Sequence, residues 1–455
     1  MNSMLIPDNV NPLPLEYRPK KPKFLSGAYR LTDRETYYQI SASKYPAFPM
    51  LRGDKKCDVV IVGGGYTGLS AAIELAKAGV AVIVIEQNKI GYGCSGRNGG
   101  HLIRGWHWEQ KDIEKKFGKT IGNMAWQIGL DSTDLVKRRI KEFNIDADYK
   151  AGWNYAPIKK SQDKYLQEVI ESLAKRNYKI KYYGKEKVKE KITTKRYIAL
   201  GEDMASGHLH PLKLSIGYAM AAKKLGAKIF EFTPAIDFDF KNGMVKTPFG
   251  HITADTIVLA GGAYLNWKRR LVKKLYQTVM PVGSYVMATE PLNDKLNPVL
   301  DNHAYCDLNW ALDYFRLSPE KRLLFGGRAT YSTLEPKNIK SWMMPRILKV
   351  FPQLKNIKID YAWGGLIDIT QNRLPDIGFV GDRAIYAQGF SGQGVNMAPI
   401  CGKILAETII AGKRGKKQQQ FEMMRKFRHL PFPGGILRTP LLVMAMAYFR
   451  FKDNF

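Results

Sequence analysis

Three glycines and one acid early in the chain could together hold a dinucleotide. Gly63, Gly65 and Gly68 stand at G-x-G-x-x-G spacing, and Glu86 follows 18 residues after the last of them. The first glycine permits a tight turn, the second lets a pyrophosphate approach the backbone, and the third lets a helix pack against a strand. A carboxylate at the position of Glu86 can accept hydrogen bonds from an adenosine ribose. The spacing therefore predicts a dinucleotide site.

The elements that must position these residues are visible in the same stretch. Residues 58–62 are mostly β-branched and apolar, which is typical of a strand buried on both faces of a parallel sheet. Leu69, Ala72, Ile73 and Ala76 then recur at helical spacing, and Gly79 follows as a left-handed cap. A second apolar strand ends at Glu86. The alternative is an ordinary glycine-rich turn between a strand and a helix. Such a turn would not require an acid at this spacing after the next strand.

Further glycine-rich segments point to a large, buried and extended cofactor. Residues 90–100 contain five glycines, residues 255–263 form an apolar strand that ends in glycines, and residues 388–396 lead into an apolar helix. Such loops supply backbone N–H groups, and a helix N-terminus favours an electron-rich partner. We expect these distant segments to meet at one site. The candidate residues are Ser95, Gly96, Arg97, Asn98, Gly99, Gly100, Gly261, Gly392, Gln393 and Gly394.

On these motifs the chain resembles the FAD-dependent D-amino-acid-oxidase and glycine/sarcosine-oxidase superfamily. Residues 95–100, 363–370, 372–378 and 430–440 are similar to the gamma-glutamylputrescine oxidase group within it. The resemblance implies FAD as the cofactor, with residues 95–100 along the pyrophosphate and isoalloxazine, a backbone contact from Ala235 to adenine, and residues 392–394 at the flavin pyrimidine. Many relatives carry His in this late loop, where the present chain has Gln393.

The resemblance also implies an α/β fold with two lobes, and the chain exceeds the limit of about 250–300 residues for a single core. A discontinuous Rossmann-like FAD-binding lobe of the glutathione-reductase type is expected from residues 57–105, 205–265 and 361–412. A mixed α+β substrate lobe with an antiparallel sheet is expected from residues 106–204 and 266–360. Alternation over residues 283–289, 313–317 and 323–327 predicts strands of that sheet. Residues 1–56 would be an N-terminal extension and residues 413–455 a C-terminal helical tail.

The implied reaction is a two-electron oxidation of an amine or amino acid, in which a C–N bond becomes an imine that water then hydrolyses. A γ-glutamylputrescine-like amine is the best candidate substrate, with O2 or an electron carrier as the acceptor. A cation-rich pocket would favour the neutral amine. The forked guanidinium of Arg328 suits a substrate carboxylate. The candidates on the substrate side are Arg328, Tyr314, Arg316, Trp363 and Arg373.

The composition of the chain excludes several other classes of protein and site. Four cysteines without C-x-x-C spacing argue against disulfides, zinc and dithiol chemistry, so no metal site is expected. Neither a secretory signal nor an apolar run long enough to span a bilayer is apparent, which favours the cytoplasm. The net charge of +30 is spread along the chain and fits a lysine-rich solvated face. Nucleic acid is therefore not an expected partner, whereas peripheral contact with an anionic membrane stays open.

Two other kinds of protein share some of these features. An FAD-dependent dehydrogenase of a hydroxy acid, or a flavoenzyme of the tRNA-modifying type, would contain the same FAD motifs. A non-catalytic nucleic-acid or membrane-binding protein would explain the charge but not the glycine loops.

Overall fold

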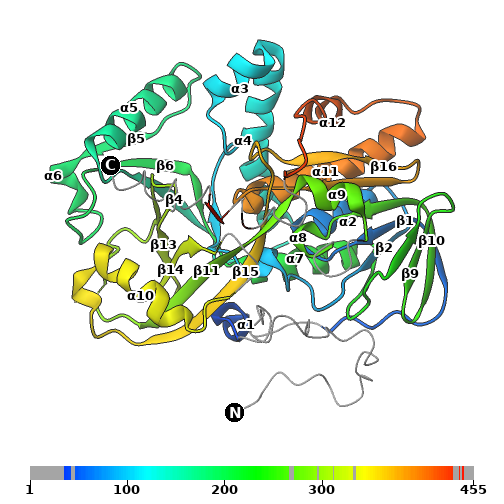
Figure 1. Cartoon of the computed structure of the whole chain (residues 1–455), viewed down its shortest axis with the longest axis horizontal. Helices are drawn as coiled ribbons and strands as arrows, with labels where there is room; N and C mark the ends of the chain where they lie inside the picture. Colours follow the sequence, from blue (N-terminus) through cyan, green and yellow to red (C-terminus); the bar gives the residue numbers. More distant parts are fainter. Residues whose placement is uncertain are drawn as a thin grey trace.

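Two β-sheets organise the chain, the first on the right and the second on the left of Figure 1. The computed structural model describes residues 35–42, 47–265, 271–294, 297–310, 312–330, 335–433, 440, 443 and 444. The side chain of Arg328 lies outside this description.

The first sheet is built around β1 (Lys55–Val62), whose last four residues are buried. β1 pairs in parallel with β2 (Val82–Ile85) on one side and with β10 (Gly250–Leu259) on the other. The strand order is β16-β17-β10-β1-β2-β7, with β9 beside β10 and β8 beside β9. The other members are β7 (Lys228–Phe230), β8 (Asp237–Asp239), β9 (Met244–Thr247), β16 (Asp376–Val380) and β17 (Ala384–Gln388). The predicted Rossmann-like arrangement of β1, helix and β2 is confirmed.

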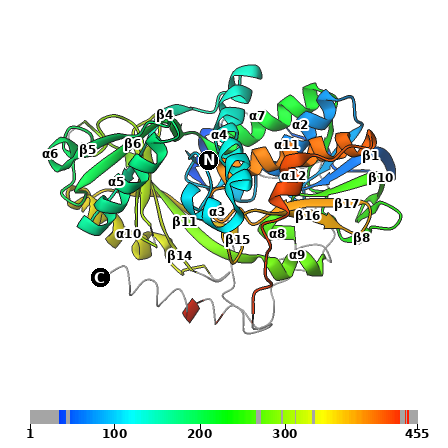
Figure 2. The same cartoon turned by 90° about the horizontal axis from the view of Figure 1, so that it is seen from above.

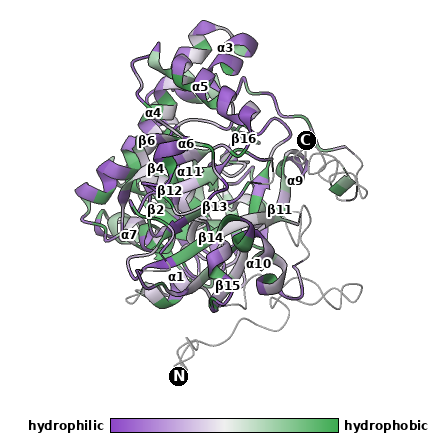
Figure 3. Cartoon of the chain, turned by 90° about the vertical axis from the view of Figure 1, so that its left-hand side faces the viewer, coloured by the Kyte–Doolittle hydropathy of each residue, from purple (hydrophilic) through white to green (hydrophobic). Residues whose placement is uncertain are grey.

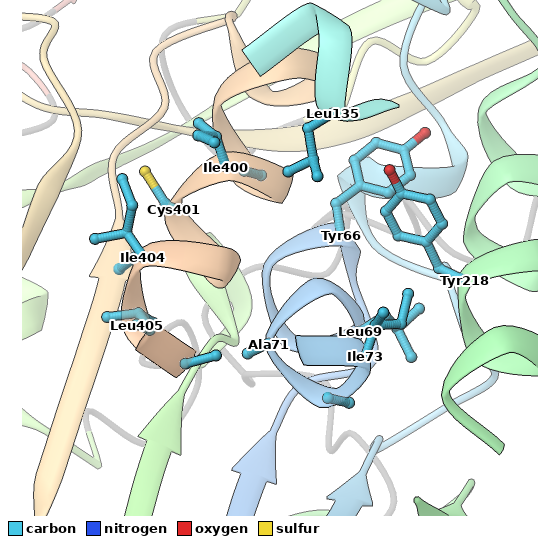
Figure 4. Packing of buried hydrophobic residues seen from close by; sticks show 14 of the residues in the cluster. Tyr66, Leu69, Ala71, Ile73, Leu135, Tyr218, Ile400, Cys401, Ile404 and Leu405 are labelled. Atoms are coloured by element: carbon cyan, nitrogen blue, oxygen red, sulfur yellow. The ribbon is translucent and has the colours of Figure 1, made fainter. Parts of the chain in front are cut away.

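Three helices build the main core beside this sheet: α2 (Tyr66–Lys77), α7 (Pro211–Lys224) and α11 (Gly394–Lys413). Figure 4 shows Ala71 of α2 on the side of Leu405 of α11, whereas Leu69 lies on the other side of α2, toward Tyr218 of α7. Gly402 permits this approach, because a Cβ there would lie 2.2 Å from the carbonyl oxygen of Thr67. Within the described residues, α11 alone is long and apolar enough to cross a membrane, but 67% of its apolar segment is buried inside the protein.

The second sheet is mostly antiparallel, as expected for the substrate lobe. Its strand order is β15-β11-β14-β13-β12-β4-β6-β3, with β5 beside β6, and β12 and β4 form its parallel pair. The strands are β3 (His101–Leu102), β4 (Lys150–Ala156), β5 (Lys181–Gly184), β6 (Ala199–His208), β11 (Met280–Pro291), β12 (Ala304–Asp307), β13 (Tyr314–Leu317), β14 (Arg322–Ala329) and β15 (Ile359–Ile369). The three strands predicted from alternation are β11, β13 and β14, so that prediction is confirmed.

Further helices surround the two sheets (Figure 2). Helix α5 shows both hydrophilic and hydrophobic residues in Figure 3, and it buries Leu166, Val169 and Leu173. The remaining helices are α1 (Tyr37–Ser41), α3 (Gln110–Phe117), α4 (Lys119–Glu142), α5 (Lys160–Ala174), α6 (Lys185–Val188), α8 (Gly262–Leu265), α9 (Lys273–Thr278), α10 (Ile339–Val350) and α12 (Gln419–Met424), with 3-10 turns at Cys94–Gly96 and Pro352–Leu354.

The observed sheets and cores shift the lobe boundaries expected from the sequence. β15 pairs with β11 of the second sheet, although the sequence places residues 361–412 in the cofactor lobe. β6 likewise belongs to the second sheet on both sides of the expected boundary at residue 205. Helix α4, expected in the substrate lobe, packs its buried face into the core formed by α2 and α11. An amphipathic pattern shows that a helix has a buried face, but it does not identify the partner.

The chain ends depart from expectation in a different way. α1, inside the expected N-terminal extension, packs Tyr37 and Tyr38 against buried residues of α7, β11 and β15. Val443 and Met444, within the expected C-terminal helical tail, are exposed. Residues 1–34 and most of the tail after residue 433 lie outside the described part of the chain.

Candidate functional site

A cavity of about 980 Å³ lies between the two sheets and receives the glycine-rich segments from all along the chain. Because parallel strands end at one edge of a sheet, the loops after β1, β2, β10 and β17 meet there. Of the predicted cofactor residues, these line the cavity: Gly63, Gly65, Glu86, Ser95, Arg97, Asn98, Gly99, Ala235, Gly261, Gly392, Gln393 and Gly394.

The turn after β1 has the geometry that the glycine spacing predicts. Gly63 has a φ of +117°, where a side chain would be strained. A Cβ on Gly68 would lie 2.0 Å from the carbonyl oxygen of Gly63, so this glycine sets the distance between helix and turn. The first turn of α2 faces the cavity, and Ser95 Oγ accepts a hydrogen bond of 3.0 Å from the Tyr66 amide. This helix terminus suits an anionic pyrophosphate.

Glu86 stands where the sequence places it and also supports the turn. Its Oε2 accepts a 2.8 Å hydrogen bond from the Gly64 amide, and its Oε1 accepts one of 2.9 Å from the Asn88 amide. Burial raises the pKa of Glu86 to about 7, against the opposing effect of these hydrogen bonds. A contact from this carboxylate to a ribose stays a prediction.

The second glycine segment uses its polar side chains largely to hold its own fold. Arg97 Nε donates to the Tyr92 carbonyl at 3.0 Å, and Asn98 Nδ2 donates to the Cys94 carbonyl at 2.9 Å. Gly96 and Gly100 are absent from the cavity lining, which corrects their predicted contact with a cofactor. A Cβ on Gly96 would lie 2.2 Å from the Gly91 carbonyl oxygen, so tight packing explains this glycine.

A buried carboxylate that the sequence analysis did not select holds the late glycine loop. Asp368, at the end of β15, accepts a 2.7 Å hydrogen bond from the Gly389 amide through Oδ2. Its backbone carbonyl accepts another of 2.9 Å from the Ser391 amide. Gly392 in this loop has a φ of +96° with open space beside it, and Gln393 precedes α11. The only signal for Asp368 in the sequence is its place in the motif at residues 363–370.

The substrate-side candidates separate into three groups. Tyr314 and Arg373 line the cavity, and the Tyr314 ring lies edge-on to His101 with 5.2 Å between ring centroids. Arg328 is in β14, between the cavity-lining Gly327 and Ala329, and its side chain is not described. Its role stays a prediction.

Arg316 and Trp363 require a correction, because both are buried and neither lines the cavity. Arg316 donates to the backbone carbonyls of Gly99 at 2.8 Å and Leu209 at 2.9 Å. Trp363 Nε1 donates to the Arg97 carbonyl at 2.9 Å. Both side chains therefore position the second glycine segment rather than face a substrate.

The charge of the cavity also differs from expectation. Among the described side chains, three arginines line it together with four acidic residues, so this part of the lining is not the cation-rich pocket that the sequence analysis expects. These lining residues are Arg97, Arg104, Arg373, Glu86, Glu109, Asp307 and Asp368. Burial raises the pKa of Asp307, and the neighbouring Asp313 adds to the effect.

One side-chain cluster away from the cavity has the composition of a metal site. Glu202, Asp301 and His303 lie close enough together to share an ion. Lys191 Nζ, however, lies 2.8 Å from Glu202 Oε1 and 3.5 Å from Asp301 Oδ2. An ammonium group therefore already supplies the positive charge at this position.

The residues around the cavity fit an extended flavin dinucleotide. The open space beside Gly392, the close helix packing at Gly68 and the position of the first turn of α2 along the cavity all suit a cofactor that lies against the backbone. The adenine end would lie near Glu86 and Ala235, and the flavin end near Gly99 and residues 392–394.

Comparisons with known proteins agree with this geometry. A family model described as FAD dependent oxidoreductase (DAO) matches residues 58–408. The chain is 36% identical over 424 residues to the gamma-glutamylputrescine oxidoreductase of Escherichia coli, covering 92% of this chain and 98% of that one. It is 24% identical to the glycine oxidase of Bacillus subtilis, covering 78% and 93% of the two chains. The solved glycine oxidase of Geobacillus kaustophilus has a TM-score of 0.68 at 20% identity, covering 80% of this chain and 96% of that one.

Proposed function

This chain belongs to the family of FAD-dependent oxidoreductases, and from that premise we propose that it oxidises the primary amine of a γ-glutamylputrescine-like substrate. The enzyme binds FAD and acts on amine or amino-acid donors. The narrower substrate is supported above all by the 36% identity that extends over 98% of the gamma-glutamylputrescine oxidoreductase chain. A cytoplasmic location and the identity of the electron acceptor stay predictions.

Bound FAD would supply the two-electron acceptor for a hydride from the carbon beside the substrate nitrogen. The protein must hold this carbon near the flavin end of the cavity and exclude water. The half-buried rings of Tyr314 and His101 supply part of the wall there. The N–H groups at the start of α11, which also lines the cavity, can stabilise negative charge.

His101 contributes to this wall as a neutral group. Trp153 Nε1 donates a 2.9 Å hydrogen bond to His101 Nδ1, which leaves the ring proton on Nε2. Burial lowers the pKa of His101 well below its usual value, and the charge of Arg316 lowers it further. A neutral imidazole does not repel a protonated amine on entry.

The oxidised substrate then adds water and separates into an aldehyde and ammonia.

Products distinguish this reaction from its main alternative. With γ-glutamylputrescine we expect one ammonia and one aldehyde for each amine consumed, measured by coupled assay and mass spectrometry. An FAD-dependent dehydrogenase of hydroxy acids would instead convert a 2-hydroxy acid into a 2-oxo acid without releasing ammonia. The proposal would be contradicted if the enzyme oxidised hydroxy acids but did not oxidise γ-glutamylputrescine, sarcosine or glycine.

FAD affinity should depend on pH through Glu86. Its raised pKa of about 7 means that the carboxyl is protonated in the cofactor-free protein at lower pH. A protonated carboxyl is a poorer acceptor for ribose hydroxyls, so the cofactor must displace the proton. We expect the Kd to rise by up to about tenfold per pH unit as pH falls below about 7. Quenching of FAD fluorescence by apoprotein measures this slope. Glu86→Gln should flatten it, and an unchanged slope in that variant would assign the pH dependence to another group.

A further inference from the structure

On the side of the second sheet, two aromatic rings hold the guanidinium of Arg104, which lines the cavity, in a fixed plane. Arg104 follows β3, and its guanidinium carbon lies 4.4 Å from the ring centroid of Tyr178 and 5.0 Å from that of Trp126. Tyr178 is itself anchored, because its hydroxyl donates to both carboxylate oxygens of Asp203 at 2.8 Å. The Arg104 amide donates to Ser206 Oγ at 3.0 Å. Stacking on aromatic rings orients the planar fork of an arginine.

This guanidinium has hydrogen-bonding capacity that the protein does not use. Among the described residues, no carboxylate forms an ion pair with Arg104, and its buried Nε has no hydrogen-bond partner. Arg139, by contrast, is paired with Glu74, and Arg322 is paired with Asp360. An unpaired guanidinium that lines a cavity is suited to a carboxylate ligand.

A carboxylate lines the same cavity and forms no ion pair with this cation. Glu109 lines the same cavity, and its Oε1 accepts a 3.0 Å hydrogen bond from the Tyr165 hydroxyl. Burial raises the pKa of Glu109, whereas the bond from Tyr165 and the charge of Arg104 lower it. Arg104 therefore lowers the pKa of Glu109, although the two side chains form no ion pair. Tyr155 also lines the cavity. Burial and the charge of Glu109 raise the pKa of Tyr155, whereas the charge of Arg104 lowers it.

From this arrangement we propose that the outer end of the cavity binds a zwitterionic α-amino acid head group, with Arg104 on its carboxylate and Glu109 on its ammonium. The inference rests on the proposed function and extends it, since a γ-glutamyl amine carries such a head group at the end remote from the reacting amine. A simple diamine would bring a second ammonium toward Arg104, and a simple acid would bring a carboxylate toward Glu109. Arg104 is then a second candidate for binding the substrate carboxylate, beside the predicted Arg328, whose side chain the structure does not describe.

The test compares two amines in the holoenzyme. γ-Glutamylputrescine carries the head group, and N-acetylputrescine keeps the amide and the reacting amine without it. We expect Arg104→Gln and Glu109→Gln each to lower kcat/KM for γ-glutamylputrescine by about ten- to a hundredfold, mainly through KM. The kcat/KM for N-acetylputrescine should stay within about twofold, since that amine lacks the charged head group that the two side chains would bind. Equal losses on both amines, or no loss on either, would overturn the proposal.

Arg176→Gln is the matched control, because Arg176 also lies over the Trp126 ring, at 5.3 Å, but pairs with Glu114 and does not line the cavity. This variant should leave kcat/KM for both amines unchanged.

A binding measurement separates this inference from the proposed function. γ-Glutamylethylamide carries the head group and the amide but no reacting amine, so its binding does not require turnover. We expect it to bind the wild-type holoenzyme, and Arg104→Gln to weaken that binding by at least about tenfold, measured by calorimetry. Failure of the wild-type protein to bind it would overturn the head-group site. Binding without any oxidation of γ-glutamylputrescine would contradict the proposed reaction alone.

Discussion

Gly68→Ala is expected to yield a protein that purifies largely without FAD. The added Cβ would lie 2.0 Å from the Gly63 carbonyl oxygen and 3.0 Å from Ile61 Cγ2. Either α2 moves away from β1 or the turn at Gly63 changes, and both displace the N–H groups that face the pyrophosphate. Overpacking of this kind costs about 1–3 kcal/mol, which corresponds to a roughly five- to hundredfold weaker Kd if cofactor binding carries it. The ratio of flavin to protein absorbance, and a titration of apoprotein with FAD, measure the loss.

Gly79→Ala is the control for this variant. Gly79 follows α2 with a φ of +75°, and no atom lies within 4 Å of the position its Cβ would occupy. Alanine there should cost about 1–2 kcal/mol of stability through backbone strain, while FAD content stays stoichiometric. Full FAD content in Gly68→Ala would show that the contact between turn and helix does not control cofactor binding.

Arg316→Met is expected to destabilise the protein by about 3–5 kcal/mol. The buried guanidinium donates to the carbonyls of Gly99, Leu209 and Leu317 and to the Tyr38 hydroxyl, over 2.8–3.2 Å. Methionine fills a similar volume but leaves these buried acceptors without their donor. We expect a lower denaturant midpoint for the holoenzyme and faster loss of FAD, because the Gly99 loop loses its link to β13.

Arg425→Met provides the comparison for an exposed arginine. Arg425 pairs with Glu422 at 3.2 Å, and both side chains are more than 40% exposed. Its replacement should change stability by less than about 0.5 kcal/mol. Equal denaturant midpoints for Arg316→Met and the wild type would mean that Arg316 does not hold the loop, and a role toward substrate would have to be reconsidered.

The cofactor half of this protein was predictable because its signals are local. A buried β-branched strand, three glycines at fixed spacing and an acid after the next strand each reflect a steric requirement of neighbouring residues. Glu86 and Gly63 therefore occupy the expected positions. The antiparallel strands of the second sheet could also be predicted, since alternation directly reports one buried and one less buried face.

The substrate side was not predictable to the same depth, because its roles depend on partners distant in the chain. Arg316 lies on an alternating strand, and nothing nearby shows that its donors reach Gly99, 217 residues away. Trp363 looks equally suited to a pocket wall, yet its indole supports the Arg97 carbonyl. Arg104 and Glu109 belong to no recognisable sequence motif, and only the fold places both of them in the cavity lining.

The measurement that tests the account most directly is an anaerobic titration of the purified holoenzyme with γ-glutamylputrescine, followed by its visible spectrum. We predict that the oxidised-flavin band disappears as the amine is added. This result would establish bound FAD and an amine donor in one experiment. A flavin spectrum that stays oxidised with this amine, but is reduced by a hydroxy acid, would contradict the proposed function and leave the family assignment intact.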